Sequence, residues 1–394
     1  DGPYKLIMKG EKRYPRVILD FGVKYGQVSS KRYIETVGED EAAKRMIGTG
    51  PFRMVEHEVG SHVRYEALDE HWRQVPYFKT IIIKKVPEEA TRIAMLKAGE
   101  ADIIDISLPF MPEVEEAGFE ARFYPTTNPI YLSLGGQILP EREAYDPSPP
   151  WVGPADDENA LKVRKALNLA IDKEAIIEHV LFGGASPVGV PYFNPGEAWT
   201  DPAWEPYPYD PEQAKKLLAE AGYPNGFELD LAAWSLPGRS EGPIVVEAVA
   251  LYWEAIGVKA SLQTVEYAAW RPYFRARNAP IQTAWCYVGT RSGKEPVSIT
   301  STVAYSGGSV LIWNTEYPEL DAITDKILVE GNLDKRAKLQ MEWGQWVYDH
   351  YTAVPIATKG VVYGINKRVG EWPLPNGTIT RTTSYDLMQH GSED

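Results

Sequence analysis

FELDLAAW (residues 227–234), IVVEAVALYWEAI (244–256) and VKASLQT (258–264) follow one another closely in the sequence. The first stretch has the composition of a β-strand, and the third alternates apolar and polar residues as a strand does. The middle stretch is long and apolar enough for a buried helix, and Gly257 stands where such a helix would end. A strand, a helix and a second strand in succession predict an α/β architecture with a mixed or mostly parallel sheet.

Segments on both sides continue this alternation. A helix is predicted over 211–220, because Asp210 can cap it, Pro211 fits its first position and Gly222 follows its end. Two consecutive helices are predicted over 163–171 and 173–182, with Asp172 capping the second. Further helices are predicted over 88–98, 267–277, 317–330 and 335–349. Strands are predicted over 49–57 and 62–68, which form a hairpin, and over 81–83, 101–106, 130–134, 281–288 and 354–365.

Composition limits what the protein can be. The chain has 394 residues, of which 44% are apolar, and this length is that of two or three domains of ordinary size. Its formal net charge of −14 makes it a poor candidate for binding nucleic acid or an anionic membrane, so no nucleic-acid partner is expected. No apolar run approaches the roughly 18 residues that a membrane-spanning helix needs. The single cysteine, Cys286, excludes a disulfide within the chain.

Seven short motifs occur in a characteristic order. They are GTGPF (48–52), DEHW (69–72), VPEEATR (86–92), LKAGEAD (96–102), VRKALNLAIDK (163–173), YDPEQA (209–214) and LLAEAGYP (217–224). Together they resemble the family 5 extracellular solute-binding proteins, the substrate receptors of peptide-type ABC importers. The resemblance covers about residues 10–370. Each motif alone is weak, and their order and spacing carry the resemblance.

The resemblance implies a clamp of two α/β lobes joined by a two-strand hinge, with an accessory domain that is mostly absent from this chain. Residues 1–27 would be the remnant of that domain, 28–136 together with 360–394 would form lobe 1, and 137–359 would form lobe 2. The chain would then cross between the lobes near 135 and near 359. The N-terminal stretch DGPY shows neither a signal peptide nor an initiating methionine.

The same resemblance implies a binding protein rather than an enzyme. It would capture a small solute in the cleft between the lobes and deliver it to an ABC transporter permease in the membrane. It would act as a monomer in the periplasm or at the outer face of the cytoplasmic membrane. Family members most often carry peptides, and some carry oligosaccharides, nickel chelates, haem or opines.

One departure from the family pattern bears on the ligand. Peptide-binding relatives have an acidic residue after the strand that ends here at Tyr287, and this acid pairs with the amino terminus of the peptide. The present sequence continues VGTRSGKE (288–295), without that acid and with Arg291 close by. The departure favours an anionic or sugar-like ligand, whereas the family as a whole favours a peptide-like one. Peptide-like and oligosaccharide ligands therefore both remain open.

The candidate ligand-binding residues lie at predicted strand ends and in loops of lobe 2. Aromatic rings stack on sugars and pack against peptide side chains, and polar groups fix the orientation of a ligand. An arginine can hold a carboxylate with two hydrogen bonds. Each of these residues has an alternative role, the aromatic ones in the core, Arg291 in a solvated loop and Asn314 in a turn. The candidates are Trp234, Trp270, Trp285, Tyr287, Arg291, Tyr305, Trp313 and Asn314.

Other chemistry has weaker support. His57 and His62 flank Gly60 and are expected on opposite faces of a hairpin, so no metal site and no cofactor are predicted. The glycines at 48 and 50 lack the third glycine of a dinucleotide fingerprint. A glycoside hydrolase with two carboxylates is the alternative from another class, but no motif points to such a pair.

Overall fold

The computed structural model describes residues 7, 9, 28–45, 47–235, 241–278, 283–288, 295–373 and 385–391. Of these, only the backbone is described at 125–127, 235, 267–268 and 283–288. Most of the predicted accessory remnant, 1–27, therefore lies outside the described residues. No helix within the described ranges is both long and apolar enough to cross a membrane.

The first third of the chain forms what we call the N-terminal group. Its three-stranded antiparallel sheet consists of β1 (Phe52–Glu58), β2 (His62–Ala67) and β3 (Thr80–Lys84). The predicted hairpin is confirmed, with Gly60 at a φ of +84° in its turn. The other elements of the group are α2 (Lys31–Val37), α3 (Glu39–Lys44), α4 (Glu89–Lys97), β4 (Ile103–Ile106), the 3₁₀ turn Leu108–Phe110 and α5 (Met111–Glu116).

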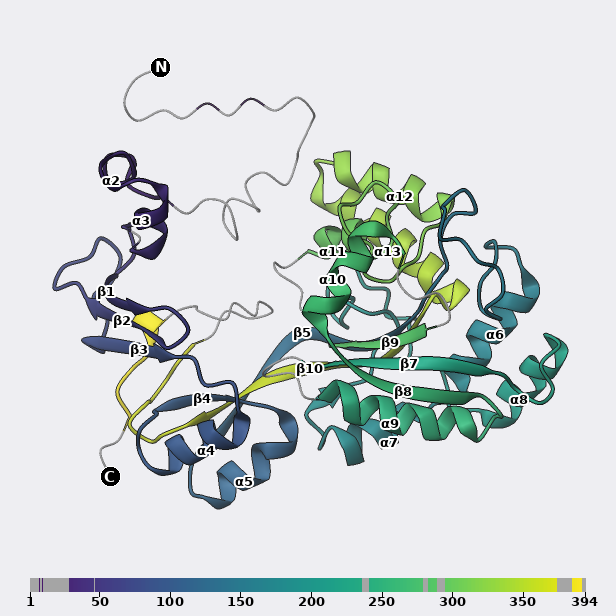
Figure 1. The fold of residues 1–394 in the computed structure, drawn as a ribbon, viewed down its shortest axis with the longest axis horizontal. Helices are drawn as coiled ribbons and strands as arrows, with labels where there is room; N and C mark the ends of the chain where they lie inside the picture. The colour runs from purple at the N-terminus through teal and green to yellow at the C-terminus, as the bar shows by residue number, and fades with distance from the viewer. Residues whose placement is uncertain are drawn as a thin grey trace.

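Two long strands connect the N-terminal group to the rest of the molecule. These crossing strands are β5 (Glu120–Leu134) and β10 (Ala353–Ile365), and they pair antiparallel along their length. At one end β10 pairs with β4, and at the other β5 pairs with β9 (Thr283–Val288). Figure 1 shows both strands running between the two parts of the molecule. The sequence predicted only residues 130–134 of β5, because the preceding residues 120–129 are rich in polar side chains and contain Pro125 and Pro129.

The remaining elements form what we call the main group. Its strands continue the sheet in the order β4-β10-β5-β9-β7-β8, and the short β6 (Ala185–Ser186) pairs with β10. The deciding stretch folds as β7 (Glu228–Ser235), α9 (Glu241–Glu254) and β8 (Lys259–Glu266), with β7 parallel to both β8 and β9. The predicted strand–helix–strand unit is thus confirmed. Gly257 ends its helical connection at a φ of +91°.

The helices of the main group begin where their capping residues predict. Asp210 accepts a hydrogen bond from the Gln213 N–H (2.8 Å) at the start of α8 (Pro211–Glu220). Asp172 accepts one from the Ala175 N–H (2.9 Å), and there the predicted helix is the short α7 (Lys173–Ala175) followed by a π-helical turn over 176–180. The other helices are α6 (Glu158–Leu169), α10 (Tyr267–Ala276), α11 (Val297–Val303), α12 (Pro318–Val329) and α13 (Leu333–His350).

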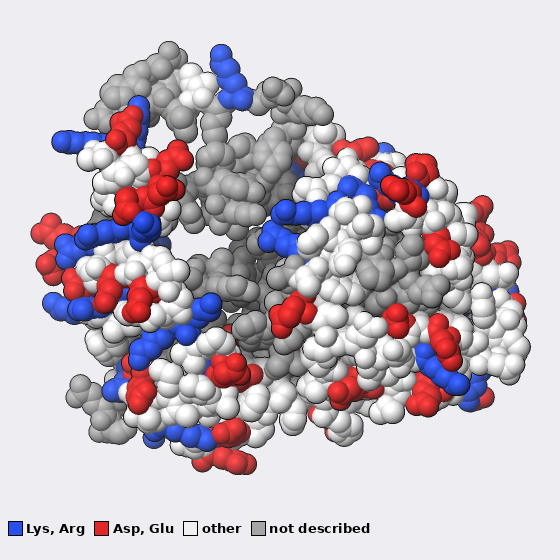
Figure 2. Space-filling view, in the orientation of Figure 1, with Lys and Arg blue, Asp and Glu red and all other residues white. Residues whose placement is uncertain are grey.

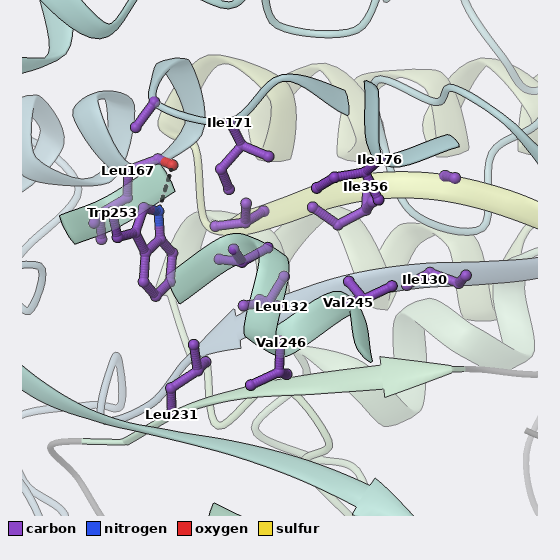
Figure 3. Close-up of a cluster of buried hydrophobic side chains, with 14 of the residues drawn as sticks. Ile130, Leu132, Leu167, Ile171, Ile176, Leu231, Val245, Val246, Trp253 and Ile356 are labelled. Carbon is purple, nitrogen blue, oxygen red and sulfur yellow. Dashed lines mark hydrogen bonds between the residues drawn. The ribbon is translucent and has the colours of Figure 1, made fainter. Parts of the chain in front are cut away.

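A continuous hydrophobic core lies between the sheet and the helices on one of its faces. Figure 3 shows this core, where Leu132 of β5, Leu231 of β7 and Val246 of α9 point toward one another. Trp253 is fully buried there, and its indole Nε1–H donates to the carbonyl of Leu167 (3.0 Å). This bond joins α9 to the last turn of α6, whose terminal carbonyls otherwise have no partner within the helix.

Lys173 is a buried cation in this part of the main group, only 3% exposed. Its Nζ donates to the carbonyls of Asn168 and Tyr207 (3.1 Å each), so it ties the end of α6 to the loop before α8. Burial lowers the pKa of Lys173 to about 7, because the charged form is poorly solvated.

The outer surface carries both signs of charge. Figure 2 shows acidic and basic side chains interspersed on one face of the molecule, and it shows that face hollowed between the N-terminal group and the main group.

Candidate functional site

Three parallel strands of the main group end at the same edge of the sheet, and one of them, β9, pairs with the crossing strand β5. β7, β8 and β9 run in one direction, so Trp234 near the end of β7 lies opposite Val265 near the end of β8. Val288, the last residue of β9, lies opposite Ile130 in the middle of β5. Ligands of open α/β sheets bind outside the carboxyl ends of parallel strands. We therefore take the ends of β7, β8 and β9, called the carboxyl edge below, as the candidate site.

Two of the predicted tryptophans meet at this edge. The rings of Trp234 and Trp270 have their centroids 6.2 Å apart, and the Trp234 ring lies 5.2 Å from Phe274. Trp270 and Phe274 are one turn apart on α10, so this helix covers the end of β7 with both rings. Trp234 is 3% exposed and Trp270 6% exposed, and both belong to the second hydrophobic cluster of the main group.

Trp313 and Asn314 lie deeper in the same region. Trp313 is fully buried, with its ring 5.7 Å from that of Tyr131 on β5 and 5.8 Å from that of Trp343 on α13. Asn314 is 1% exposed and has a φ of +50°, a conformation that asparagine tolerates in turns. Neither its Oδ1 nor its Nδ2 has a hydrogen-bond partner in the described part of the chain. Buried amides are normally paired, so this one requires a partner from elsewhere.

The remaining predicted residues are placed differently. The hydroxyl of Tyr305 donates to Asp325 Oδ1 of α12 (2.6 Å), and Tyr305 is outside the cluster that contains Trp234, Trp270 and Trp313. The backbones of Trp285 and Tyr287 lie in β9 opposite Ser133 and Tyr131 of β5. Their side chains, and the whole of Arg291, lie outside what the structure describes. A role for these eight residues in ligand contact stays a prediction.

A buried ion pair at the crossing strands had no signal in the sequence. Lys359 of β10 donates through Nζ to Oε1 of Glu241, the first residue of α9, and both side chains are 5% exposed or less. Asn128 lies directly opposite Lys359 in β5. Among the described residues, Asn128 Oδ1 and Glu241 Oε2 have no hydrogen-bond partner. Only the long-range fold brings these three residues together, since they come from three distant parts of the chain.

Asp105 of the N-terminal group lies near the charge of Lys359. It lies on β4 opposite Tyr363 of β10. Desolvation by the surrounding protein raises the pKa of Asp105, and nearby Arg92 and Lys359 oppose that shift. Arg92 itself donates to the carbonyl of Asp105 (2.8 Å) and so fixes the strand to the start of α4.

A second buried charge pair holds the segment that follows β9. Glu295 lies just before α11, and Arg336 of α13 donates to both of its carboxylate oxygens. Gln340, one turn further along α13, donates to Oε1 of the same carboxylate (2.8 Å). The two side chains of the ion pair are 4% and 8% exposed. This network anchors one end of the connection that leaves the carboxyl edge after β9.

The described residues contain no cluster of three or more histidine, cysteine, aspartate or glutamate side chains suited to a metal ion. The register of β1 and β2 pairs His57 with Val63 and His62 with Glu58. Since side chains alternate along a strand, His57 and His62 lie on opposite faces of the hairpin, as predicted.

These features define a periplasmic binding protein fold, and comparison with known proteins assigns the family. Residues 4–304 match the model of the bacterial extracellular solute-binding proteins, family 5 Middle. The chain belongs to this family. Its members are binding proteins rather than enzymes, and they act outside the cytoplasm. The resemblance found in the seven motifs is thereby confirmed.

Individual relatives differ in what their names say they bind. The chain is 30% identical over 388 residues to a heme-binding protein A of Haemophilus influenzae. This alignment covers 96% of the present chain and 66% of that protein. The chain is 26% identical over 372 residues to a dipeptide-binding protein of Escherichia coli, in an alignment that covers 89% of the present chain and 64% of that protein. The chain thus spans just under two thirds of the length of these relatives.

Solved structures show the same fold over most of the chain. A periplasmic binding protein of Helicobacter pylori in complex with the peptide STSA matches with a TM-score of 0.74 at 19% identity, covering 96% of this chain and 71% of that one. A dipeptide-binding protein of a Pseudoalteromonas strain in complex with Met-Leu matches with a TM-score of 0.74 at 20% identity, covering 96% and 72%.

Proposed function

We propose that this protein captures a small, peptide-like solute at the carboxyl edge and delivers it to an ABC importer. The observation that carries the proposal is that three parallel strands end at one edge of the sheet, and that one of them, β9, pairs with the crossing strand β5. The N-terminal group and the main group would then close on a solute bound at this edge. In this proposal the lobes are 28–136 with 360–394 and 137–359, and the partner is a membrane permease.

Peptide-like chemistry has the better support of the two ligand classes. The unpaired amide of Asn314 matches the donor and acceptor groups of a peptide backbone. Two relatives, from Escherichia coli and Pseudoalteromonas, are also named as dipeptide-binding proteins.

Native mass spectrometry of the purified chain, repeated after denaturation, tests for a captured solute. We expect an added mass that leaves on unfolding and fragments as a peptide. An added mass that fragments as a sugar or as haem would refute the peptide assignment. If no added mass is found, the chain is titrated calorimetrically with Met-Leu and with maltotriose. Binding of maltotriose and not of Met-Leu would equally refute the peptide assignment.

The role of Asn314 is tested with Asn314→Gly, because glycine keeps the positive φ and removes the amide. We expect this variant to bind the captured peptide at least tenfold more weakly. Asn225→Gly is the matched control, since Asn225 is exposed on the turn before β7, at the opposite edge of the sheet. Equal affinity of the two variants would remove Asn314 from the site.

A further inference from the structure

Glu316 is a buried carboxylate that lies two residues after Asn314, and it is bound by two arginines. Its side chain is completely shielded from solvent. Oε1 accepts hydrogen bonds from Arg142 Nη2 (2.6 Å) and Arg277 Nε (3.1 Å). Oε2 accepts from Arg142 Nε (2.9 Å) and from the N–H of Leu139 (3.3 Å). Both oxygens are thus occupied, and hydrogen bonds to charged groups fix the position of the carboxylate.

Arg277 connects this carboxylate to the end of α10. It follows the helix directly and has a φ of +55°, in the left-handed region. Its Nη2 donates to the carbonyls of Ser306 and Gly308 (2.7 Å each), while its Nε donates to Glu316. A residue other than glycine keeps such a conformation only where its surroundings fix it. Glu316 therefore helps to fix the end of the helix that carries Trp270 at the carboxyl edge.

The backbone around Glu316 connects the same segment to the crossing strands. The N–H of Glu316 donates to the carbonyl of Gln137 (2.7 Å), and Thr315 forms a β-bridge with Gln137. Gln137 Nε2 in turn donates to the carbonyl of Leu134, the last residue of β5 (2.9 Å), and to that of Thr352, just before β10 (3.1 Å). The segment before Glu316 is thus fixed relative to both crossing strands.

We propose that Glu316 is a positioning residue for solute binding, which holds the side-chain amide of Asn314 in the place where it meets the solute. The inference rests on the proposed function, in which Asn314 binds the solute. Asn314 has a φ of +50°, and neither polar atom of its side chain has a partner among the described residues. Its own side chain therefore does not hold it in place, and the bonds of Glu316 do so instead.

Glu316→Gln tests this role because it keeps the shape of the side chain and removes its charge. Glutamine has one acceptor oxygen, and its amide nitrogen would face a donor of Arg142 or Arg277. We expect Asn314 to lose its position and the affinity for Met-Leu to fall about tenfold. Lys173→Met is the matched control. It removes another buried charge of the main group, one that is bonded to the carbonyls of Asn168 and Tyr207, and it should leave the affinity unchanged.

A double-mutant cycle separates positioning from a general effect on the fold. Met-Leu is titrated calorimetrically into the wild type, Asn314→Gly, Glu316→Gln and the double variant. If Glu316 acts by placing the amide of Asn314, its substitution should cause little further loss of affinity in the Asn314→Gly background, where no amide remains to be placed. A residue that only stabilises the fold would weaken binding by the same factor in both backgrounds.

Equal losses in the two backgrounds would overturn the proposal, and so would wild-type affinity of a folded Glu316→Gln protein. If Asn314→Gly binds Met-Leu as the wild type does, or if the wild type does not bind it, the premise about Asn314 fails and the inference fails with it. If Glu316→Gln does not fold, Arg277→Lys is judged by the same cycle. Lysine keeps the charge but lacks the fork that reaches Glu316 and the two carbonyls together.

Discussion

The buried ammonium of Lys173 predicts a defined pH dependence of stability. Its pKa is lowered to about 7 in the folded protein, against an ordinary value of 10.5. Between these values the unfolded chain binds more protons than the folded one, so the free energy of unfolding rises with pH. The contribution of Lys173 to the free energy of unfolding is lowest below pH 7, where its side chain is protonated in both the folded and the unfolded state. From the two pKa values, about 2 kcal/mol is gained between pH 7 and pH 9.

Urea unfolding at pH 7 and pH 9, followed by tryptophan fluorescence and circular dichroism, measures this gain. Lys173→Met is the matched control, because it removes the titrating group and keeps most of the side-chain length. We expect the free energy of unfolding of the wild type to rise by about 2 kcal/mol more than that of the variant. Burial raises the pKa of Tyr207 well above 10, so Tyr207 does not titrate between pH 7 and pH 9. The same pH dependence in both proteins would refute the reasoning.

Three further substitutions test the packing of the molecule. Gly360→Ala, on the crossing strand β10, places a Cβ 2.3 Å from the Phe123 ring, and it should lower the free energy of unfolding by about 1–3 kcal/mol; an unchanged urea midpoint would show that the crossing strands can separate. Arg336→Met leaves Glu295 buried without its partner and should cost about 3–5 kcal/mol; the double variant with Glu295→Gln should recover most of this loss in a thermal melt. Trp253→Phe removes the indole donor to α6 and should cost about 1–3 kcal/mol; a loss below about 0.5 kcal/mol would mean that water replaces the bond.

Local sequence signals predicted most of the main group. Caps such as Asp210 and Asp172, and the stop at Gly257, act within one turn of the residues they control, so they can be recognised without a partner. Residues 120–129 of β5 could not be predicted in this way. They form a strand because β10 pairs with them, and that partner lies more than two hundred residues later.

The candidate site was less predictable than the fold. Trp234 could be singled out because an aromatic residue at a strand end is visible in the sequence, whereas Trp270 lies on α10. Their mutual contact and their burial depend on how α10 is placed across β7. Lys359, Glu241 and Asn128 are ordinary polar residues in sequence, and only the crossing of β5 and β10 makes them neighbours.

The position of β4 has a consequence for synthesis and folding. Its one neighbour in the described sheet is β10, at the far end of the chain, and not β5, which follows β4 directly. Residues 103–106 therefore cannot pair as a strand until residues 362–365 have been synthesised. Most of the main group lies between these two segments, so it can fold while β4 still has no partner strand. Such widely separated pairings form slowly, because a long loop must close first. The last strand that the structure describes is thus the one that pairs with β4 of the N-terminal group.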